Sequence, residues 1–323
     1  MKPHTGARST RMALIAASLV AALALSGCAP LVSVFEQLIR SSQGSKPTEV
    51  VGTDFGGQQP RWRECGDMQC AAVQAPLDWA DPEGERIKLA LVKQPALSGN
   101  PIGTLFVNPG GPGASGVNYI SSSIDYAVGA DLQQQYDVIG WDPRGVGASS
   151  AVTCLDNSAM DDYLFGSSET DDLEPGSQAW VDAALVEIAE FGEACLDATG
   201  PLRAHVDTGS TVQDLNMLRE IVGDDKLNYL GYSYGTYIGA RFADAYPERV
   251  GRLVLDGAID PTSSEAEVVR EQTRGFELAL RAYVTDCLTR NECPLSGSVD
   301  QAMSQWRALL DQVEADPLTA DDG

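Results

Sequence analysis

The residues with the clearest chemical potential form the Gly-x-Ser-x-Gly pattern Gly231-Tyr232-Ser233-Tyr234-Gly235. They follow a short apolar run at 227–230 and precede a helical pattern, so they predict a sharp turn from a buried strand into a helix. Glycines flank such a turn because side chains there would collide with the neighbouring strand and helix. Ser233 would then present its hydroxyl as a nucleophile, and the Tyr234 N–H at the start of the helix would face a developing oxyanion.

A second pattern, Asn108-Pro109-Gly110-Gly111-Pro112-Gly113, directly follows the apolar run 104–108. Backbone N–H groups converge on an oxyanion only where side chains leave room, which explains the glycines. We expect the N–H of Gly110 or Gly111 to complete an oxyanion hole with that of Tyr234. Phosphate binding is the alternative function of such a loop. It is disfavoured because the sequence lacks both G-x-G-x-x-G spacing and a following Gly-Lys-Ser/Thr.

A third pattern, Asp142-Pro143-Arg144-Gly145, follows the apolar run 136–141. Asp142 and Arg144 are of residue types that can catalyse. In a tight turn after a strand, however, they are more often held in a structural ion pair. We therefore expect a structural role for both residues.

The elements that must position these patterns alternate between strands and helices. Two antiparallel strands are predicted at 71–77 and 87–93, and buried strands at 104–108, 136–141, 227–230 and 252–256. Helices are predicted at 177–196 and 210–222. This order indicates an α/β fold with a mostly parallel sheet and helices on both faces.

The helical predictions carry further detail. In 177–196, Ile188 and Cys195 share one apolar face with Trp180, Ala184 and Phe191, and the helix at 210–222 is expected to begin at a cap formed by Ser210 or Thr211. The acidic stretch 156–176 lacks periodicity and is predicted to be a surface excursion. Two long helical patterns, 264–288 and 299–315, close the sequence and indicate the start of a helical cap.

Charge narrows the range of partners. The formal net charge of the 323 residues is −24, and the segment 1–27 contains Lys2, Arg8 and Arg11 but no acidic residue. The remainder is therefore even more acidic than the whole. Such a body is unsuited to nucleic acid or anionic lipid and fits a soluble exported protein.

The segment 1–27 predicts a signal peptide, because a basic stretch precedes a short apolar run at 12–25. That run is too short to cross a membrane as a helix. It ends in Leu25-Ser26-Gly27-Cys28, which resembles a bacterial lipobox in which Cys28 is acylated. An ordinary signal peptide with an incidental cysteine is the alternative. We expect an envelope lipoprotein on the outer face of the cytoplasmic membrane, or a secreted protein, with a flexible tether at 28–58.

Six further cysteines suggest disulfides in an exported chain, although 15 connectivities are formally possible. The sequence-local pairing joins Cys65 to Cys70, Cys154 to Cys195, and Cys287 to Cys293. The second pair would close the longest loop and stabilise most, by on the order of 3–4 kcal/mol in the chain-entropy model. Zinc is disfavoured because no Cys-x-x-Cys pair occurs, so no metal is predicted.

Taken together, residues 62–261 resemble the prolyl-aminopeptidase-like α/β-hydrolases, and within them the secreted bacterial tripeptidyl aminopeptidases. The resemblance rests on 108–116, 142–147, 231–236 and 254–257. It implies an α/β-hydrolase core at 59–262, followed at 263–323 by the first part of a helical cap. It also implies Ser233 as nucleophile, with an oxyanion hole from the backbone N–H groups of Tyr234 and of Gly110 or Gly111. The implied chemistry is release of short peptides from free N-termini through an acyl-enzyme. We also expect a monomer without a cofactor.

A general base and its orienting acid are missing from this picture. In this fold the order along the chain is serine, acid, histidine, yet no histidine follows Ser233. His205 precedes it, and Asp256 is expected to be a structural turn residue. The sequence is therefore interpreted as the N-terminal part of a peptidase whose acid and base lie beyond residue 323.

Two other functions stay open. An esterase or lipase would use the same fold, because the fold does not choose the acyl group. A non-catalytic, peptide-binding lipoprotein on a decayed hydrolase scaffold is the alternative from a different class.

Overall fold

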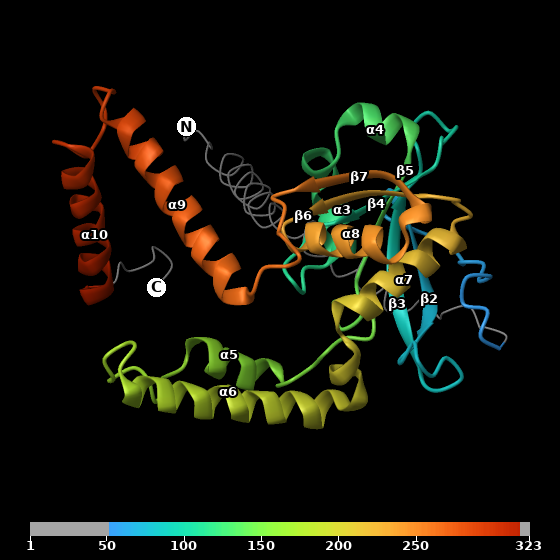
Figure 1. Ribbon diagram of the computed structural model, residues 1–323, viewed down its shortest axis with the longest axis horizontal. Helices are drawn as coiled ribbons and strands as arrows, with labels where there is room; N and C mark the ends of the chain where they lie inside the picture. Colours follow the sequence, from blue (N-terminus) through green and yellow to red (C-terminus); the bar gives the residue numbers. More distant parts are fainter. Residues whose placement is uncertain (1–51, 317–323) are drawn as a thin grey trace, which may run out of the picture. The chain divides into compact units, whose positions relative to one another are not determined.

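The computed structural model describes residues 52–316 (Figure 1). The predicted signal peptide, Cys28 and the first part of the predicted tether lie outside the described residues. In this described part of the chain seven strands form one sheet: β1 Arg63–Cys65, β2 Met68–Pro76, β3 Arg86–Gln94, β4 Thr104–Asn108, β5 Asp137–Trp141, β6 Leu227–Tyr232 and β7 Val250–Asp256. Within residues 52–316, no helix has the length and apolar character needed to cross a membrane.

The sheet places the ends of its central parallel strands side by side. Its order is β1-β2-β3-β5-β4-β6-β7, with β1 to β3 antiparallel, β3 antiparallel to β5, and β5, β4, β6 and β7 parallel. Because β4 lies between β5 and β6, the three loops that follow these strands leave the same edge of the sheet. These loops carry the three sequence patterns, and such an edge is where open α/β sheets place their ligands.

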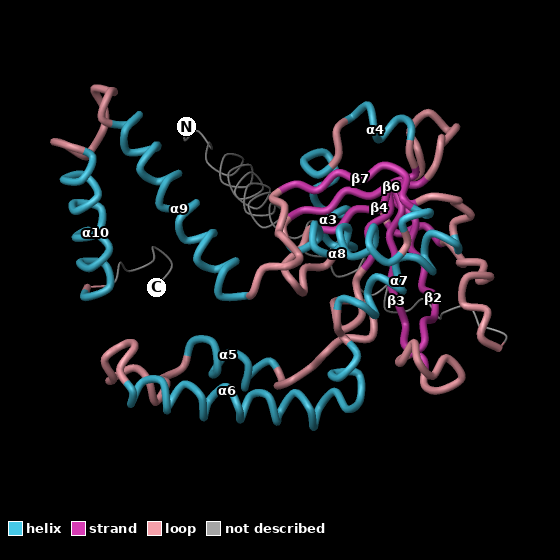
Figure 2. Tube along the Cα trace, in the orientation of Figure 1, coloured by secondary structure: helices cyan, strands magenta, loops and turns pink. Residues whose placement is uncertain are grey.

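Helices cover both faces of the sheet (Figures 1 and 2). The helices that precede residue 259 are α3 Gly116–Ala127, α4 Ala130–Gln135, α5 Asn157–Phe165, α6 Gln178–Thr199, α7 Thr208–Ile221 and α8 Tyr234–Ala245. Two short 3₁₀ turns, η1 Gly200–His205 and η2 Pro247–Arg249, follow α6 and α8 respectively. Helices α7 and α8 pack on one face through residues such as Leu215 and Ile238. Helix α3 packs on the other face through Val117 and Ile120.

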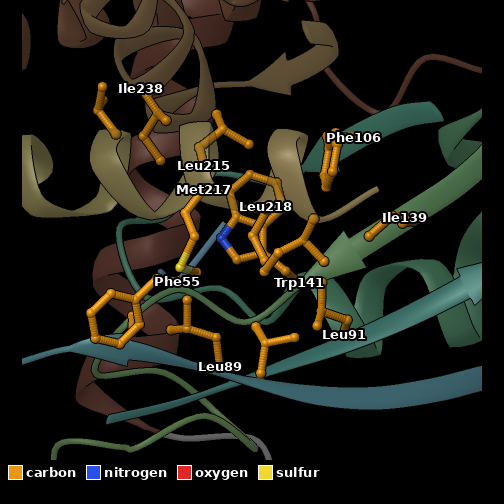
Figure 3. Close-up of a cluster of buried hydrophobic side chains, with 14 of the residues drawn as sticks. Phe55, Leu89, Leu91, Phe106, Ile139, Trp141, Leu215, Met217, Leu218 and Ile238 are labelled. Atoms are coloured by element: carbon orange, nitrogen blue, oxygen red, sulfur yellow. The ribbon is translucent and has the colours of Figure 1, made fainter. Parts of the chain in front are cut away.

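The strands divide their side chains between these two layers. Phe106 and Ile139 join the α7–α8 layer, shown in Figure 3, whereas their neighbours Val107 and Val138 join the α3 layer. This alternation follows from the two-residue period of a strand, and because both alternating sets are apolar the strands read as continuous hydrophobic runs. The predicted α/β class and mostly parallel sheet are confirmed.

The N-terminal boundary of the folded part was predicted too late. The tether was expected to run to residue 58, yet Phe55 is only 3% exposed and Gln58 only 4%. The Gln58 amide donates to the Gln74 carbonyl at 2.8 Å and accepts from the Gln74 N–H at 2.8 Å, pairing with β2 as a backbone would. The polar composition of the segment concealed this packing.

The segment 151–199 also differs from expectation. The excursion predicted at 156–176 contains helix α5, whose N-cap Asp156 accepts from the Ala159 N–H at 2.9 Å. The predicted apolar face of α6 is not buried: Ile188 is 60% exposed, and Cys195 is the one residue of that helix classed as buried. Helical periodicity therefore identified α6 correctly but not its packing.

Helix α7 begins two residues earlier than predicted, and its cap is a different residue. Asp207 is the N-cap, and its carboxylate accepts from the Ser210 N–H at 2.9 Å and from the Ser210 hydroxyl at 2.8 Å. The predicted cap residues Ser210 and Thr211 lie inside the helix. A carboxylate competes successfully for this position because it faces the positive end of the helix dipole.

Strand β7 is an edge strand and is not buried as predicted. It pairs with β6 alone among the described strands, and Val254 is 58% exposed. The apolar run predicted a strand correctly, but a run of this kind does not distinguish a central strand from an edge.

Between residues 52 and 316, three disulfides join the sequence-local pairs Cys65–Cys70, Cys154–Cys195 and Cys287–Cys293. The first links β1 to β2 across their turn. The second ties the start of the α5–α6 segment to the end of α6, which anchors an arm with few buried residues to the chain that returns to α7.

A second compact unit begins at Ile259, close to the predicted boundary after residue 262. It contains α9 Glu265–Cys287 and α10 Val299–Ala315, both opened by capping boxes, at Ser264 with Glu267 and at Ser298 with Gln301. Few of its side chains are buried, and Phe276 and Leu309 are exposed.

Candidate active site

Ser233 occupies a strained turn between β6 and α8. Its backbone angles are φ 51° and ψ −121°, and it is the one non-glycine residue with positive φ in the described part of the chain. Such a conformation costs about 1–3 kcal/mol and persists only where the surroundings enforce it. The residue itself is exposed. The predicted strand–turn–helix geometry is therefore present, with the serine at its tip.

Hydrogen bonds on both sides enforce this turn. The Ser233 N–H donates to the Asp256 carbonyl at the end of β7, at 2.9 Å. The Ser233 carbonyl accepts from the Thr236 N–H at 2.9 Å and from the Thr236 hydroxyl at 2.6 Å. The backbone of Ser233 is thus fixed by these bonds, and its side chain makes no capping hydrogen bond to α8.

The flanking glycines are required by close approach. A Cβ at Gly231 would lie 2.4 Å from the Gly235 carbonyl oxygen, and one at Gly235 would lie 2.8 Å from the Asn108 carbonyl oxygen. Both distances are shorter than non-bonded atoms tolerate. The end of β4 therefore packs directly against the first turn of α8.

The glycine-rich loop lies against the elbow. A Cβ at Gly110 would be 3.1 Å from the Ser233 Cβ and 2.9 Å from the Tyr234 nitrogen, so only glycine fits at this contact. The Gly110 N–H donates to the Asn108 Oδ1 at 2.9 Å. Of the two predicted loop donors, Gly110 is thus engaged within its own loop, which leaves Gly111 as the candidate to face an oxyanion beside Tyr234.

A cavity of about 240 Å³ borders this contact. It is lined on the elbow side by Gly110 and Tyr234, and farther in by residues of the 143–152 loop, the η1–α7 connection and α8, among them Val146, Val206 and Ile238. The Tyr234 ring is held in the lining because its hydroxyl bonds to the Thr208 hydroxyl at 2.6 Å.

Asp142 is a buried structural residue that joins the third sequence pattern to α3. Its Oδ1 accepts from the Ser115 hydroxyl at 2.5 Å and from the Val117 N–H at 3.0 Å, and its Oδ2 accepts from the Ala148 N–H at 2.7 Å. Burial raises the pKa of this carboxyl, against the opposing effect of these hydrogen bonds and of Lys88. The predicted structural role agrees with these contacts.

Arg144 is also structural, but its ion-pair partner is Asp214 of α7. The Nε and Nη2 atoms each donate to that carboxylate at 2.7 Å, and both side chains are fully inaccessible to solvent. The remaining N–H groups donate to the carbonyls of Pro76, Leu77 and His205. All five guanidinium donors are therefore satisfied.

The Asp214 carboxylate has a third donor, the Trp79 indole N–H at 3.0 Å. Burial raises the pKa of Asp214, against the opposing pull of Arg144 and of this indole. The network links the end of β2, the 142–152 loop and α7, which is the frame on which the cavity is built. Sequence reasoning missed Asp214, since it lies 70 residues from Arg144 within an ordinary helical pattern.

His205 and Asp256 both contribute to this region through their backbone carbonyls. His205 ends η1, where its carbonyl accepts from Arg144, and no hydrogen bond joins its imidazole to Ser233 among residues 52–316. Asp256 braces the elbow through its carbonyl, as the structural interpretation of that residue requires. Within the same residues, no group of three or more His, Cys, Asp or Glu side chains could hold a metal ion.

Known proteins place this arrangement in a family. The model of the alpha/beta hydrolase fold matches residues 103–319. The serine protease Hip1 of Mycobacterium tuberculosis is 35% identical over 303 residues, which cover 93% of this chain and 56% of that protein. The tripeptidyl aminopeptidase of Streptomyces lividans is 36% identical over 274 residues, covering 83% of this chain and 50% of that protein.

A third relative, carboxylesterase B of Mycobacterium tuberculosis, is 33% identical over 281 residues, covering 83% of this chain and 53% of that protein. The chain thus spans about half the length of the curated relatives it matches. The family model covers more than half of the chain and includes the elbow, the glycine-rich loop and the parallel strands that carry them. The chain therefore belongs to the alpha/beta hydrolase fold family.

Proposed function

We propose that the protein is a serine peptidase that cleaves short peptides, with tripeptides as the leading class, from the free N-termini of its substrates. The observation that carries this proposal is the exposed Ser233 at a positive-φ turn, with its backbone fixed and Gly110 against it. The Ser233 oxygen would attack the carbonyl carbon and pass its proton to a general base. The amine of the shortened substrate would leave with a proton, and water would then release the acyl group.

The oxyanion would be stabilised by the backbone N–H groups of Tyr234 and Gly111. Tyr234 is the first residue of α8, so its N–H has no partner within the helix and lies at the positive end of the dipole. Gly111 is favoured over Gly110 because the Gly110 N–H already donates to Asn108. We assign the general base and its orienting acid to no described residue.

The peptide class rests on the relatives named tripeptidyl aminopeptidase and serine protease. Two further observations agree with it: the segment 1–28 carries the sequence pattern of a lipoprotein signal, and the disulfides suit an oxidising compartment. Cys28 would bear the lipid anchor. Ester hydrolysis is the second candidate, because one relative is named carboxylesterase B.

The test is hydrolysis by the full-length protein of matched tripeptidyl amides and acyl esters, together with labelling by a fluorophosphonate. We expect the protein to hydrolyse the amides, and we expect the fluorophosphonate label to map to Ser233. In Ser233→Ala the activity should fall by roughly a thousandfold or more. The matched control is Ser122→Ala, an exposed serine of α3. Equal turnover by Ser233→Ala would refute the proposal, and turnover of esters alone would replace the peptidase with an esterase.

A further inference from the structure

We infer that the cavity beside Ser233 binds the side chain of the residue whose carbonyl Ser233 attacks, and that it selects an uncharged aliphatic side chain. This inference rests on the proposed function and adds a substrate class to it. It is carried by the position of the cavity, by its lining and by the state of its polar groups.

Position links the cavity to the acyl group. Gly110 and Tyr234 are both lining residues and immediate neighbours of the Ser233 side chain. An acyl carbon attached to the Ser233 oxygen would have its oxyanion on the N–H groups of this same corner. The substituent next to that carbon would then lie beside this cavity, because Gly110 and Tyr234 border both the Ser233 side chain and the cavity.

The size and surface of the cavity suit an aliphatic group. Its volume of about 240 Å³ far exceeds the roughly 10–15 Å³ that admits one water. Most of the lining residues are apolar or glycine, and the apolar ones are Pro112, Pro143, Val146, Val152, Val206 and Ile238. Such a surface favours a branched aliphatic side chain, because binding removes the apolar area of both from water.

The one charged lining residue is not available to a ligand. Arg144 contributes to the wall, but each of its five N–H groups already donates to Asp214 or to a backbone carbonyl. A carboxylate in the cavity would have to break one of these bonds. An ammonium group would find no carboxylate among the lining residues. Both kinds of charged side chain are therefore disfavoured.

One polar group in the wall does lack a partner. The Asn108 side chain is fixed by the bond from the Gly110 N–H to its Oδ1, and its Nδ2 is buried without a hydrogen bond, in a residue that is 1% exposed. A buried donor left unpaired is unfavourable for folding. Because this nitrogen is shielded from solvent, it offers no hydrogen bond to a side chain in the cavity.

The test compares tripeptidyl substrates that differ only in the last acyl residue, which is glycine, alanine, threonine, leucine, lysine or glutamate. The wild-type protein should favour leucine over lysine and glutamate by at least about tenfold in kcat/KM. Val206→Trp should fill the cavity and lower the value for leucine about tenfold more than the value for glycine. Val206→Glu should raise the value for lysine relative to leucine. Val186→Trp, at an exposed valine of α6, is the matched control.

Equal losses for glycine and leucine in Val206→Trp, or a wild-type preference for a charged residue, would overturn the inference. A separate readout does not depend on catalysis. Calorimetric binding of the corresponding tripeptide acids to Ser233→Ala should show the same order, leucine above lysine and glutamate, and the same effect of Val206→Trp. If that order is found while no substrate is turned over, the proposed peptidase activity fails but the assignment of the cavity stands.

Discussion

Two groups of polar residues meet at the carboxyl edge of the sheet, and they differ in how completely they are satisfied. Arg144 and Asp214 are inaccessible to solvent, and every donor of the guanidinium has an acceptor. Ser233 is exposed in a strained backbone conformation, and Asn108 Nδ2 is buried without a partner. The satisfied group supports the loops, whereas the exposed Ser233 side chain is the one that remains accessible to a ligand.

The largest effect should follow from breaking the satisfied group. Arg144→Leu leaves the Asp214 charge buried without its partner, so we expect the free energy of unfolding to fall by about 3–5 kcal/mol. Arg241→Leu is the matched control, because Arg241 forms a 3.6 Å pair with Asp244 at the surface and such pairs contribute about 0–1 kcal/mol. Urea denaturation measures both variants.

A double replacement sharpens this first comparison. If the loss comes from the uncompensated charge, Arg144→Leu combined with Asp214→Leu should recover part of the stability lost in the single variant. A double variant that loses the sum of both single losses would instead show that the pair itself is the main source of stability.

The second effect concerns the contact between the glycine-rich loop and the elbow. Gly110→Ala would place a methyl group 2.4 Å from the Tyr232 carbonyl oxygen, at a φ of +93°. We expect kcat/KM to fall by about a hundredfold, because small displacements of positioned groups have effects of that size. Gly223→Ala is the control, with a φ of +82° and open space around its Cβ. It should lose stability to strain without losing activity, and equal activity losses would contradict this explanation.

How far the sequence predicts this molecule depends on how local each feature is. The elbow and the glycine-rich loop were predicted with their boundaries because 231–235 and 108–113 are continuous runs in which the backbone geometry itself demands glycine. The pairing of Arg144 with Asp214 was not predicted, since the two residues meet only after β5 and α7 are packed together.

The remaining differences have the same origin. Asp207, Ser210 and Thr211 are all residue types that cap helices, and the choice of Asp207 depends on where the η1 turn ends. The exposure of β7 and of the apolar face of α6 depends on what covers them, which periodicity does not encode. The confirmed prediction of fold class needed only the order and type of elements.

The third effect distinguishes the cost of the strained backbone at Ser233 from the role of its hydroxyl in activity. Ser233→Gly removes the side chain that makes positive φ unfavourable, so stability should rise by about 1 kcal/mol after allowing for the greater freedom of glycine in the unfolded chain. Ser233→Ala keeps the Cβ and should change stability by less than about 0.5 kcal/mol. Both variants should be inactive. Thermal unfolding measures the difference, and equal stabilities of the two variants would show that the turn is not strained.

The smallest effect is expected at Asp207, the cap of the helix that carries Asp214. Burial works to raise the pKa of this carboxyl, but the hydrogen bonds from Ser210 and the nearby Arg144 outweigh it, and the net shift is downward. A lowered folded pKa means that the ionised cap stabilises the fold above the unfolded value of 3.8, and that this contribution is lost as pH falls through the folded pKa. Asp207→Ala should therefore cost about 1 kcal/mol at neutral pH.

The pH dependence distinguishes this charged cap from a neutral one. As pH falls from neutral and the Asp207 carboxyl becomes protonated, the difference in unfolding free energy between wild type and Asp207→Ala should decrease. The difference between Asp207→Ser and Asp207→Ala should stay constant, because a hydroxyl cap does not titrate in this pH range. Urea denaturation at a series of pH values measures all three proteins. A gap between wild type and Asp207→Ala that stays constant down to acid pH would mean that the cap acts by hydrogen bonding alone. The negative charge of Asp207 would then make no contribution to the stability of the network around Arg144.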